Sequence, residues 1–342
     1  MNKTRIAING FGRIGRTILR ILLLSESDIE VVAINDLGDY ETLAYLLKYD
    51  TVFGVLKEDV KVENEKLIVG DSIKDISLIS ERDPSLIPWK KLNVDIVIES
   101  TGVFSNKDSL KKHLDAGARK VILTVPPKDK IDATIVMGVN DQILDKNMKL
   151  ISNASCTTNC LAPIAKVLDE NFGIISGLMT TVHAYTNDQA LADTTHNDFR
   201  RGRNATQNII PTTTGAAKAV GMVLPNLNDK LDGLAMRVPV PDGSVVDLVA
   251  ELEKDTTVKE VNSAMKIASE TEMKGIIEYS SVPLVSSDII GNPASSIIDS
   301  SSTQLLGGNF VRLLAWYDNE WGYSNRIVDL VEHIIKKENN EL

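Results

Sequence analysis

The alternation of short apolar runs with amphipathic stretches over the first 150 residues constrains the fold most. Six runs are apolar at nearly every position, namely residues 4–9, 30–35, 94–100, 120–125, 133–139 and 149–154. This pattern is typical of parallel strands that are covered on both faces. Helical patterns lie between the runs, for example at 15–25 and 41–49. The sequence therefore predicts an α/β domain built on a doubly wound sheet.

The pattern changes after residue 155. A helical pattern at 157–171 is followed by longer strand patterns at 177–186, 233–241 and 244–253, the last two joined by the turn sequence "PDGS". Further helical patterns cover 258–273 and 326–337, and the serine-rich stretch 295–303 suits a hairpin loop. Strands in runs with separate helices predict an α+β second domain with an antiparallel or mixed sheet.

Composition excludes several classes of protein. The net charge of −10 argues against a non-specific nucleic-acid binder, because neutralising phosphates requires a basic surface. No apolar run reaches the ~18 residues of a membrane helix, and the N-terminus lacks the pattern of a secretory leader. Two cysteines cannot form a disulfide framework. We therefore expect a cytoplasmic protein with no nucleic-acid or membrane partner.

A glycine-rich loop follows the first predicted strand. Gly10, Gly12 and Gly15 have G-x-G-x-x-G spacing and open a helix, and Asp36 ends the second strand. Such glycines let the backbone approach a pyrophosphate at a helix N-terminus, while the acidic residue accepts hydrogen bonds from a ribose diol. This context indicates a Rossmann-type site for NAD. The alternative is a glycine-rich turn with a solvent-facing Asp36.

Cys156 and Cys160 are the only cysteines, four residues apart in "SNASCTTNCLAP". A helix would strain a disulfide at this spacing, and none of the four histidines has zinc-ligand spacing, so no metal site is predicted. Cys156 lies where a strand ends and a helix begins, so we expect the helix N-terminus to stabilise its thiolate. His183 is the candidate base, although a strand histidine alone would be a structural residue. Cys160 is expected to be buried.

Several motifs resemble phosphorylating glyceraldehyde-3-phosphate dehydrogenase: "INGFGRIGR", "LLKYD", "SNASCTTNCLAP", "HAYTNDQ", "IIPTTTGAAKAVG", "LAMRVPVP" and "WYDNEWGYSNR". The resemblance runs from residue 4 to about 335. It implies an NAD-binding domain at 1–155, completed by a C-terminal helix at 320–342, and a catalytic domain at 156–319 with a mainly antiparallel sheet. It also implies glyceraldehyde 3-phosphate and inorganic phosphate as substrates, and a homotetramer.

The resemblance also implies site residues. Cys156 corresponds to the family's nucleophile and His183 to its base. The positions that match cofactor contacts are Gly10, Phe11, Gly12, Arg13, Ile14, Gly15, Asn35, Asp36, Arg82, Thr101, Gly102, Thr124, Asn319 and Tyr323. The positions that match the two anion pockets are Ser155, Thr157, Thr186, Asp188, Arg201, Thr214, Gly215 and Arg237.

The sequence departs from the family pattern at two places. Gly202, Asn204 and Thr206 replace alanines, and Thr194 and Thr195 replace a Leu-Pro pair of NAD-specific members. The second departure bears on cofactor preference, although Asp36 favours NAD over NADP. Two alternatives stay open: an erythrose-4-phosphate dehydrogenase, and a non-catalytic dinucleotide-binding protein whose thiol senses oxidants or binds a partner.

Overall fold

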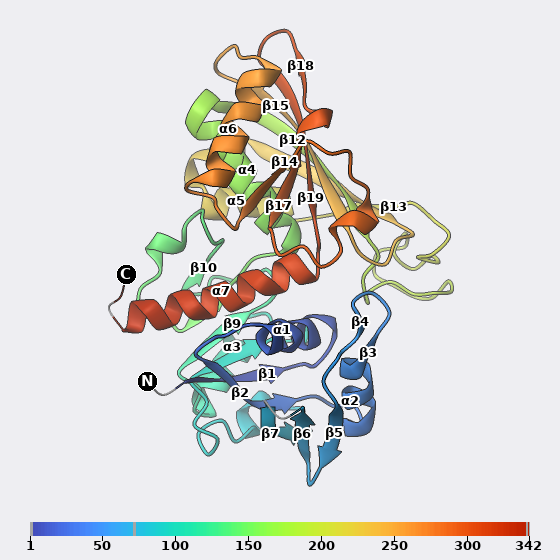
Figure 1. The fold of residues 1–342 in the computed structure, drawn as a ribbon, viewed down its shortest axis with the longest axis vertical. Coiled ribbons are helices and arrows are strands. Elements are labelled where there is room, and N and C mark those ends of the chain that lie inside the picture. Colours follow the sequence, from blue (N-terminus) through green and yellow to red (C-terminus); the bar gives the residue numbers. More distant parts are fainter. Residues whose placement is uncertain (1–2, 71–72, 340, 342) are drawn as a thin grey trace. The chain divides into compact units, whose positions relative to one another are not determined.

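The computed structural model describes residues 3–70, 73–339 and 341. The chain forms two compact units (Figure 1). The first comprises Met1–Ile135, Gln142–Ala154 and Ser324–Leu342, and the second comprises Val136–Asp141 and Ser155–Tyr323. Among the described residues, no helix combines the length and the apolar character needed to cross a membrane.

The first unit is built on a sheet of strand order β10-β11-β9-β8-β1-β2-β7-β6-β5. Its parallel strands are β1 (Thr4–Asn9), β2 (Ile29–Asn35), β7 (Ile73–Ile79), β8 (Ile96–Glu99), β9 (Lys120–Leu123), β10 (Ala133–Thr134) and β11 (Leu150–Ser152). The antiparallel hairpin of β5 (Val60–Glu63) and β6 (Lys66–Val69) extends one edge. The predicted doubly wound sheet is confirmed.

Helices α1 (Arg13–Leu24) and α2 (Tyr40–Lys48) of the first unit overlap the predicted helical patterns 15–25 and 41–49. Helix α3 (Lys107–Asp115) was not predicted. Strands β8 and β9 are buried along their whole length, which explains why each is apolar at three of its four positions. The final helix α7 (Trp321–Glu338) starts five residues before the predicted 326, and Glu338 receives ion pairs from Arg119 and Lys120.

The second unit contains a mixed sheet of order β13-β14-β12-β15-β19-β17-β16. Its strands are β12 (Ile174–Ala184), β13 (Ile210–Thr213), β14 (Leu231–Val238), β15 (Ser244–Leu252), β16 (Ile277–Ser280), β17 (Ser296–Asp299) and β19 (Phe310–Tyr317), with β18 (Gln304–Leu306) beside β19. Most pairs are antiparallel, while β12 with β14 and β16 with β17 are parallel. The prediction of a mainly antiparallel sheet is confirmed.

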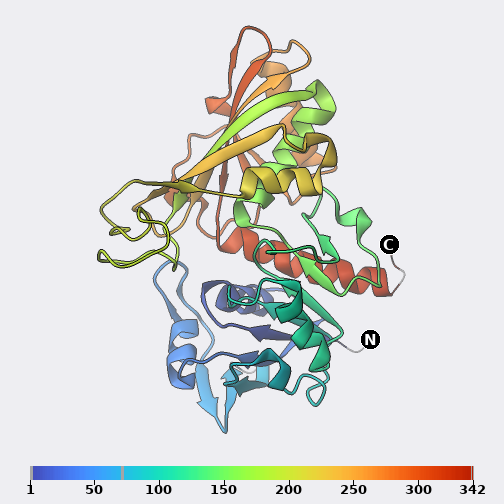
Figure 2. The same cartoon turned by 180° about the vertical axis from the view of Figure 1, so that it is seen from behind.

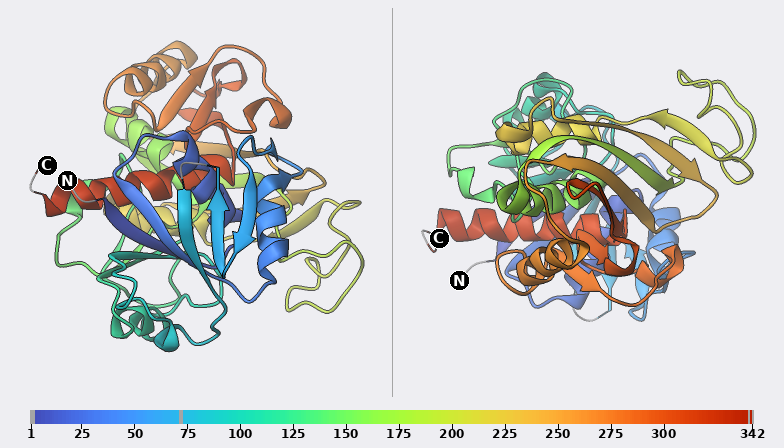
Figure 3. Two further views of the ribbon diagram at one scale, coloured as in Figure 1. Left: turned by 60° about the horizontal axis from the view of Figure 1, so that its bottom comes forward. Right: turned by 90° about the horizontal axis from the view of Figure 1, so that it is seen from above.

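Helix α4 (Cys156–Phe172) lies along this sheet. It contacts α5 (Ala216–Val223), α6 (Val258–Glu270) and strands β12, β15, β17 and β19, and Figure 2 shows α4 in green beside α5 in yellow. The loop between β12 and β13, residues 185–209, extends away from the sheet, as the right panel of Figure 3 shows. This loop carries several predicted anion-binding positions.

Two expectations were wrong in detail. The predicted strand 133–139 stops at Thr134, because Asn140 and Asp141 accept backbone N–H groups of residues 136 and 138 and fold the chain into a turn. The serine-rich stretch 295–303 is no hairpin loop, since Ile297 and Ile298 are buried in β17. The turn "PDGS" connects β14 to β15, as predicted, and the two strands lie on opposite sides of β12.

Candidate active site

Cys156 is the first residue of α4. The Ser155 side chain caps this helix by accepting the N–H of Thr158 at 3.0 Å. Ala154, directly before the cap, has the left-handed φ of 54°, which is uncommon for a residue with a side chain. Backbone strain of this kind concentrates at functional positions. The tight strand-to-helix turn thus presents the thiol at the helix N-terminus.

His183 lies next to the thiol. Its Nε2 is 3.5 Å from Cys156 Sγ, and the side chain comes from the penultimate residue of β12. Parallel pairing of β12 with β14 sets His183 opposite Arg237. The sheet register therefore brings the imidazole and the guanidinium together beside the Cys156 thiol, which the sequence alone could not establish.

The other imidazole nitrogen has two neighbours. His183 Nδ1 lies 2.6 Å from the carbonyl oxygen of Ala184 and 2.6 Å from Nη1 of Arg237, which also donates to that carbonyl at 2.9 Å. The carbonyl favours hydrogen on Nδ1, which leaves the Nε2 lone pair facing the thiol, whereas the Arg237 guanidinium can only donate and favours hydrogen on Nε2. Arg237 Nε is buried and has no partner among the described residues.

The site disfavours charge on both reacting groups. Burial raises the pKa of the Cys156 thiol, although the charge of Arg237 and hydrogen bonds from Thr157 oppose the shift. Burial, with the nearby Arg237 charge, lowers the pKa of His183 to about 3. Burial therefore favours the neutral forms of the thiol and the imidazole. The expected stabilisation of a Cys156 thiolate by the helix N-terminus stays a prediction.

Tyr317 supports the site from β19, and the sequence reasoning missed it. Its hydroxyl bonds with those of Thr157 and Thr181, each at 2.8 Å, and its ring meets the His183 ring edge-on with centroids 5.9 Å apart. Thr157 thus turns its hydroxyl toward Tyr317. Cys160 is fully buried, as predicted, with Sγ 3.7 Å from a carbonyl of β19.

Asn319 and Tyr323 are both buried in the second unit. Ser244 donates to Asn319 Oδ1 at 2.6 Å and accepts the N–H of Ala184 at 3.1 Å. These bonds fix the amide orientation, because Oδ1 must face the serine. Ser244 was not predicted, since nothing in "PDGSVVDL" signals a contact with a residue 75 positions away.

The remaining anion-pocket candidates are held by one another. Arg201 donates to Asp188 at 2.7 Å and to Thr212 at 2.9 Å, and Thr186 donates to the other oxygen of Asp188. Although burial raises the pKa of Asp188, the Thr186 hydrogen bond and the Arg201 charge outweigh that effect and lower it. At the start of α5, Thr214 accepts the N–H of Ala216, and Gly215 is the N-cap residue.

A cavity of ≈ 680 Å³ opens in the first unit around the glycine loop. Of the predicted cofactor positions, those that line it are Asn35, Gly10, Gly12, Asp36, Arg82 and Thr101. A Cβ on Gly10 would lie 2.6 Å from the Thr101 nitrogen, whereas a Cβ on Gly12 would enter open space. The chain therefore packs tightly behind the loop and leaves room in front of it, which fits a dinucleotide.

Asp36 is held as an acceptor by two backbone groups, the N–H of Phe11 at 2.7 Å and that of Gly38 at 2.8 Å. Arg13 does not line the cavity; it pairs with Asp50 at 2.5 Å and lies over the Phe53 ring. Four further candidates are also outside the lining, namely Phe11, Ile14, Gly15 and Gly102. Thr124 is buried and donates to the carbonyl of Glu99, so it too is not part of the wall.

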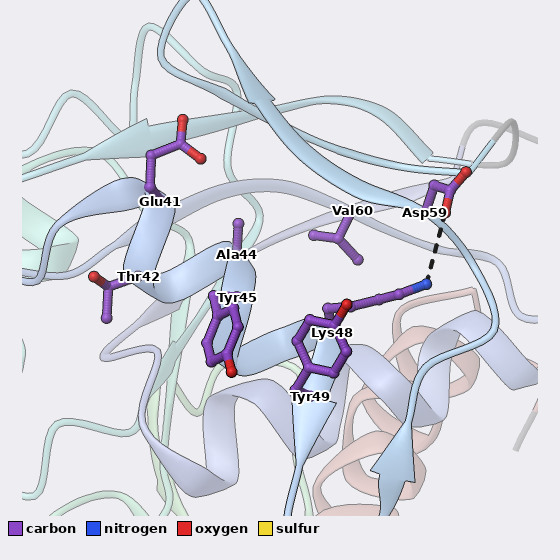
Figure 4. Close-up of a pocket in the computed structure, with 8 residues that line it drawn as sticks. All are labelled: Glu41, Thr42, Ala44, Tyr45, Lys48, Tyr49, Asp59 and Val60. Atoms are coloured by element: carbon purple, nitrogen blue, oxygen red, sulfur yellow. Dashed lines mark ion pairs between the residues drawn. The ribbon is translucent and has the colours of Figure 1, made fainter.

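A second hollow of ≈ 580 Å³ lies beside α2 (Figure 4). The Tyr45 and Tyr49 rings lie there at a tilt of 43° with their centroids 4.9 Å apart, and Lys48 Nζ is 3.7 Å from a carboxylate oxygen of Asp59. None of the predicted cofactor or anion-binding residues lies in its wall. The hollow is therefore separate from the glycine-loop cavity of the same unit.

Two family profiles match the chain. Residues 4–107 match the glyceraldehyde 3-phosphate dehydrogenase NAD binding domain, and residues 155–319 match the C-terminal domain of the same family. Glyceraldehyde-3-phosphate dehydrogenase of Geobacillus stearothermophilus is 57% identical over 334 residues, which cover 97% of this chain and 98% of that protein. Glyceraldehyde-3-phosphate dehydrogenase of Streptomyces coelicolor is 59% identical over 328 residues, covering 95% and 97%. The chain therefore belongs to the glyceraldehyde-3-phosphate dehydrogenase family and uses NAD.

Proposed function

We propose that this chain oxidises D-glyceraldehyde 3-phosphate with NAD and inorganic phosphate to 1,3-bisphosphoglycerate, in glycolysis and gluconeogenesis. The observation that carries the proposal is the 3.5 Å approach of His183 Nε2 to Cys156 Sγ at the start of α4. This arrangement of a nucleophile beside a base suits acyl chemistry at an aldehyde. We further propose that residues 1–155 with 320–342 bind NAD and that 156–319 form the catalytic domain.

His183 is the proton carrier in this mechanism. As a neutral imidazole it takes the Cys156 proton at Nε2, and the sulfur adds to the aldehyde carbon. His183 then returns that proton to the former carbonyl oxygen, which gives a thiohemiacetal and a neutral imidazole. His183 then accepts the hydroxyl proton as the adduct collapses to a thioester on Cys156. When bound, the nicotinamide supplies the hydride acceptor, and the proposed residue for its carboxamide is Asn319.

Phosphate completes the turnover by attacking the thioester carbon, which releases an acyl phosphate and the Cys156 sulfur. The proposed anion contacts are Thr186, Arg201, Thr214 and Arg237, together with Ser155, Thr157, Asp188 and Gly215. The unpartnered Nε of Arg237 supports this role, because a buried donor without an acceptor is costly unless a ligand satisfies it. The two free thiols are consistent with a reducing cytoplasm, and the family resemblance implies a homotetramer.

The test is steady-state NADH formation with glyceraldehyde 3-phosphate and with erythrose 4-phosphate, each with and without inorganic phosphate. We expect the three-carbon substrate to react faster and to require phosphate. Faster turnover of the four-carbon sugar would favour the erythrose-4-phosphate alternative. Absence of NADH in all four reactions would leave the thiol-sensor alternative.

A further inference from the structure

Glu99 is a fully buried carboxylate that the proposed mechanism does not use. Its Oε2 accepts hydrogen bonds from Asn9 Nδ2 at 2.5 Å and from His113 Nε2 at 3.0 Å. Its Oε1 accepts the backbone N–H of Thr101 at 2.9 Å and also the Thr101 hydroxyl. Both oxygens are therefore occupied by donors from three separate segments.

The direction of the bonds is fixed on the His113 side. The Trp89 indole N–H can only donate, and it lies 3.0 Å from His113 Nδ1. Nδ1 must therefore accept, so the hydrogen of the neutral imidazole is on Nε2 and points to Glu99. Trp89 and His113 are both fully buried, so water cannot replace either partner.

The direction is also fixed on the other side. Asn35 accepts the backbone N–H of Glu81 at 2.8 Å, which leaves its amino group to donate to Asn9 Oδ1 at 2.7 Å. The amino group of Asn9 must then face Glu99. Two chains of donors thus converge on one oxygen, and a charged carboxylate is the side chain that accepts at both oxygens.

This network joins the ends of three neighbouring strands. Asn9 ends β1, Asn35 ends β2, and Glu99 ends β8, in a sheet where β1 lies between the other two. Asn9, Asn35 and Thr101 line the glycine-loop cavity, whereas Glu99, His113 and Trp89 do not. A ligand in an α/β protein binds at the carboxyl ends of such strands.

We propose that Glu99 and His113 are positioning residues for NAD: the buried carboxylate holds Asn9, Asn35 and Thr101 in the arrangement that the dinucleotide requires, and Trp89 fixes the imidazole tautomer that supports it. The inference rests on the dinucleotide-binding role of the first unit. It predicts that substitutions of Glu99 or His113, which do not line the cavity, lower the affinity for NAD.

Glu99→Gln tests the proposal, with Asp95→Asn as the matched control. Asp95 lies just before β8, at the opposite end of that strand from Glu99, where it accepts from the Arg5 backbone N–H and the Arg119 side chain. A glutamine at 99 leaves at least one buried donor without an acceptor, so the Kd for NAD, measured by calorimetry, should rise roughly 10-fold or more. Asp95→Asn should change that Kd by less than ~2-fold while lowering the unfolding temperature.

His113→Phe is the second variant, because it keeps a ring in the buried space and leaves the Asn9 and Thr101 bonds to Glu99 intact. It should raise the Kd for NAD by about 3–10-fold. In both variants KM for NAD should rise far more than kcat falls at saturating NAD. If Glu99→Gln and His113→Phe fold and bind NAD as tightly as the wild type, the inference is overturned but the proposed function is not. A wild-type chain that does not bind NAD would overturn the proposed function as well.

Discussion

The Glu99 network of the first unit and the Cys156 site of the second differ in how fully their buried polar groups are hydrogen-bonded. Around Glu99 each oxygen has two donors, and the donors themselves are oriented by further bonds. Around Cys156, a buried guanidinium nitrogen of Arg237 has no partner within the described part of the chain, and one imidazole nitrogen has two competing neighbours. The Glu99 carboxylate therefore has its hydrogen-bond partners without a ligand, whereas Nε of the Arg237 guanidinium lacks one among the residues that the structure describes.

The difference indicates how each region works. A satisfied buried network resists change and can hold neighbouring loops in place. A buried site with unmet hydrogen-bonding capacity can change its hydrogen bonds when a ligand binds. Substitutions in the second region should therefore change the chemical step, and substitutions in the first should change affinity.

The largest effect should follow from Cys156→Ser. A serine hydroxyl ionises far less readily than a thiol, so oxidation should fall by roughly four orders of magnitude or more. Cys160→Ser is the matched control, because Cys160 is buried one turn further along α4 and points to a carbonyl. It should keep most activity in NADH-formation assays. Equal losses in the two variants would remove the single-nucleophile assignment.

His183→Asn should slow turnover by about 10²–10⁴-fold, the range typical of lost acid–base catalysis. Without the imidazole, the Cys156 thiol loses its proton acceptor, so its alkylation by iodoacetamide should shift to higher pH. His196→Asn provides the same substitution in the loop between β12 and β13, and it should alter neither profile. If the alkylation profile of His183→Asn matched that of wild type, His183 would not be the base.

Substitution of Asp36 should change the preference for NAD over NADP, an effect smaller than the losses of activity predicted for Cys156 and His183. The Asp36 carboxylate lines the cavity and is held by two backbone N–H groups, so a 2′-phosphate would meet a fixed like charge. We expect NAD to be preferred over NADP by roughly 10–100-fold in kcat/KM. Asp36→Ala should narrow the ratio mainly by improving NADP, whereas Asp39→Ala, which removes an exposed carboxylate at the start of α2, should not. Equal wild-type efficiency would point instead to Thr194 and Thr195.

Local signals in the sequence predicted much of the fold and the centre of the site. Glycine spacing located the turn into α1, and the strand-to-helix pattern put Cys156 at the start of α4. The partners that complete the site depend on long-range pairing. Tyr317 reaches Thr157 across 160 positions, and Glu99 reaches Asn9 across 90, so no sequence spacing could reveal either contact. The roles assigned to the site residues stay predictions.

A pair of carboxyl groups in the second unit gives the last prediction. Substitution there should change turnover least and should change the free energy of unfolding clearly. Asp242 and Asp318 are both buried, and Asp318 already accepts the backbone N–H groups of Gly291, Glu320 and Trp321. As a carboxylate, Asp242 Oδ2 has no donor among the described residues. Protonated, it can donate to Asp318, so the pair holds the "PDGS" turn against the segment that carries Asn319.

Burial, the charge of Asp318 and that of Glu320 together raise the pKa of Asp242 to about 9. The unfolded chain releases this proton near pH 4 and the folded chain near pH 9, so folding retains a proton that the unfolded state has lost. The stability from the protonated pair is therefore complete below about pH 4 and declines as the pH rises toward 9.

Asp242→Asn keeps the donor without a titrating group and should raise the free energy of unfolding at pH 8 by about 1–3 kcal/mol. Urea denaturation at pH 5 and pH 8 checks this, with Asp247→Asn on the exposed Arg312 pair as the control. A wild-type chain whose stability between those values falls no faster than that of Asp242→Asn would show that the two carboxyls do not share a proton.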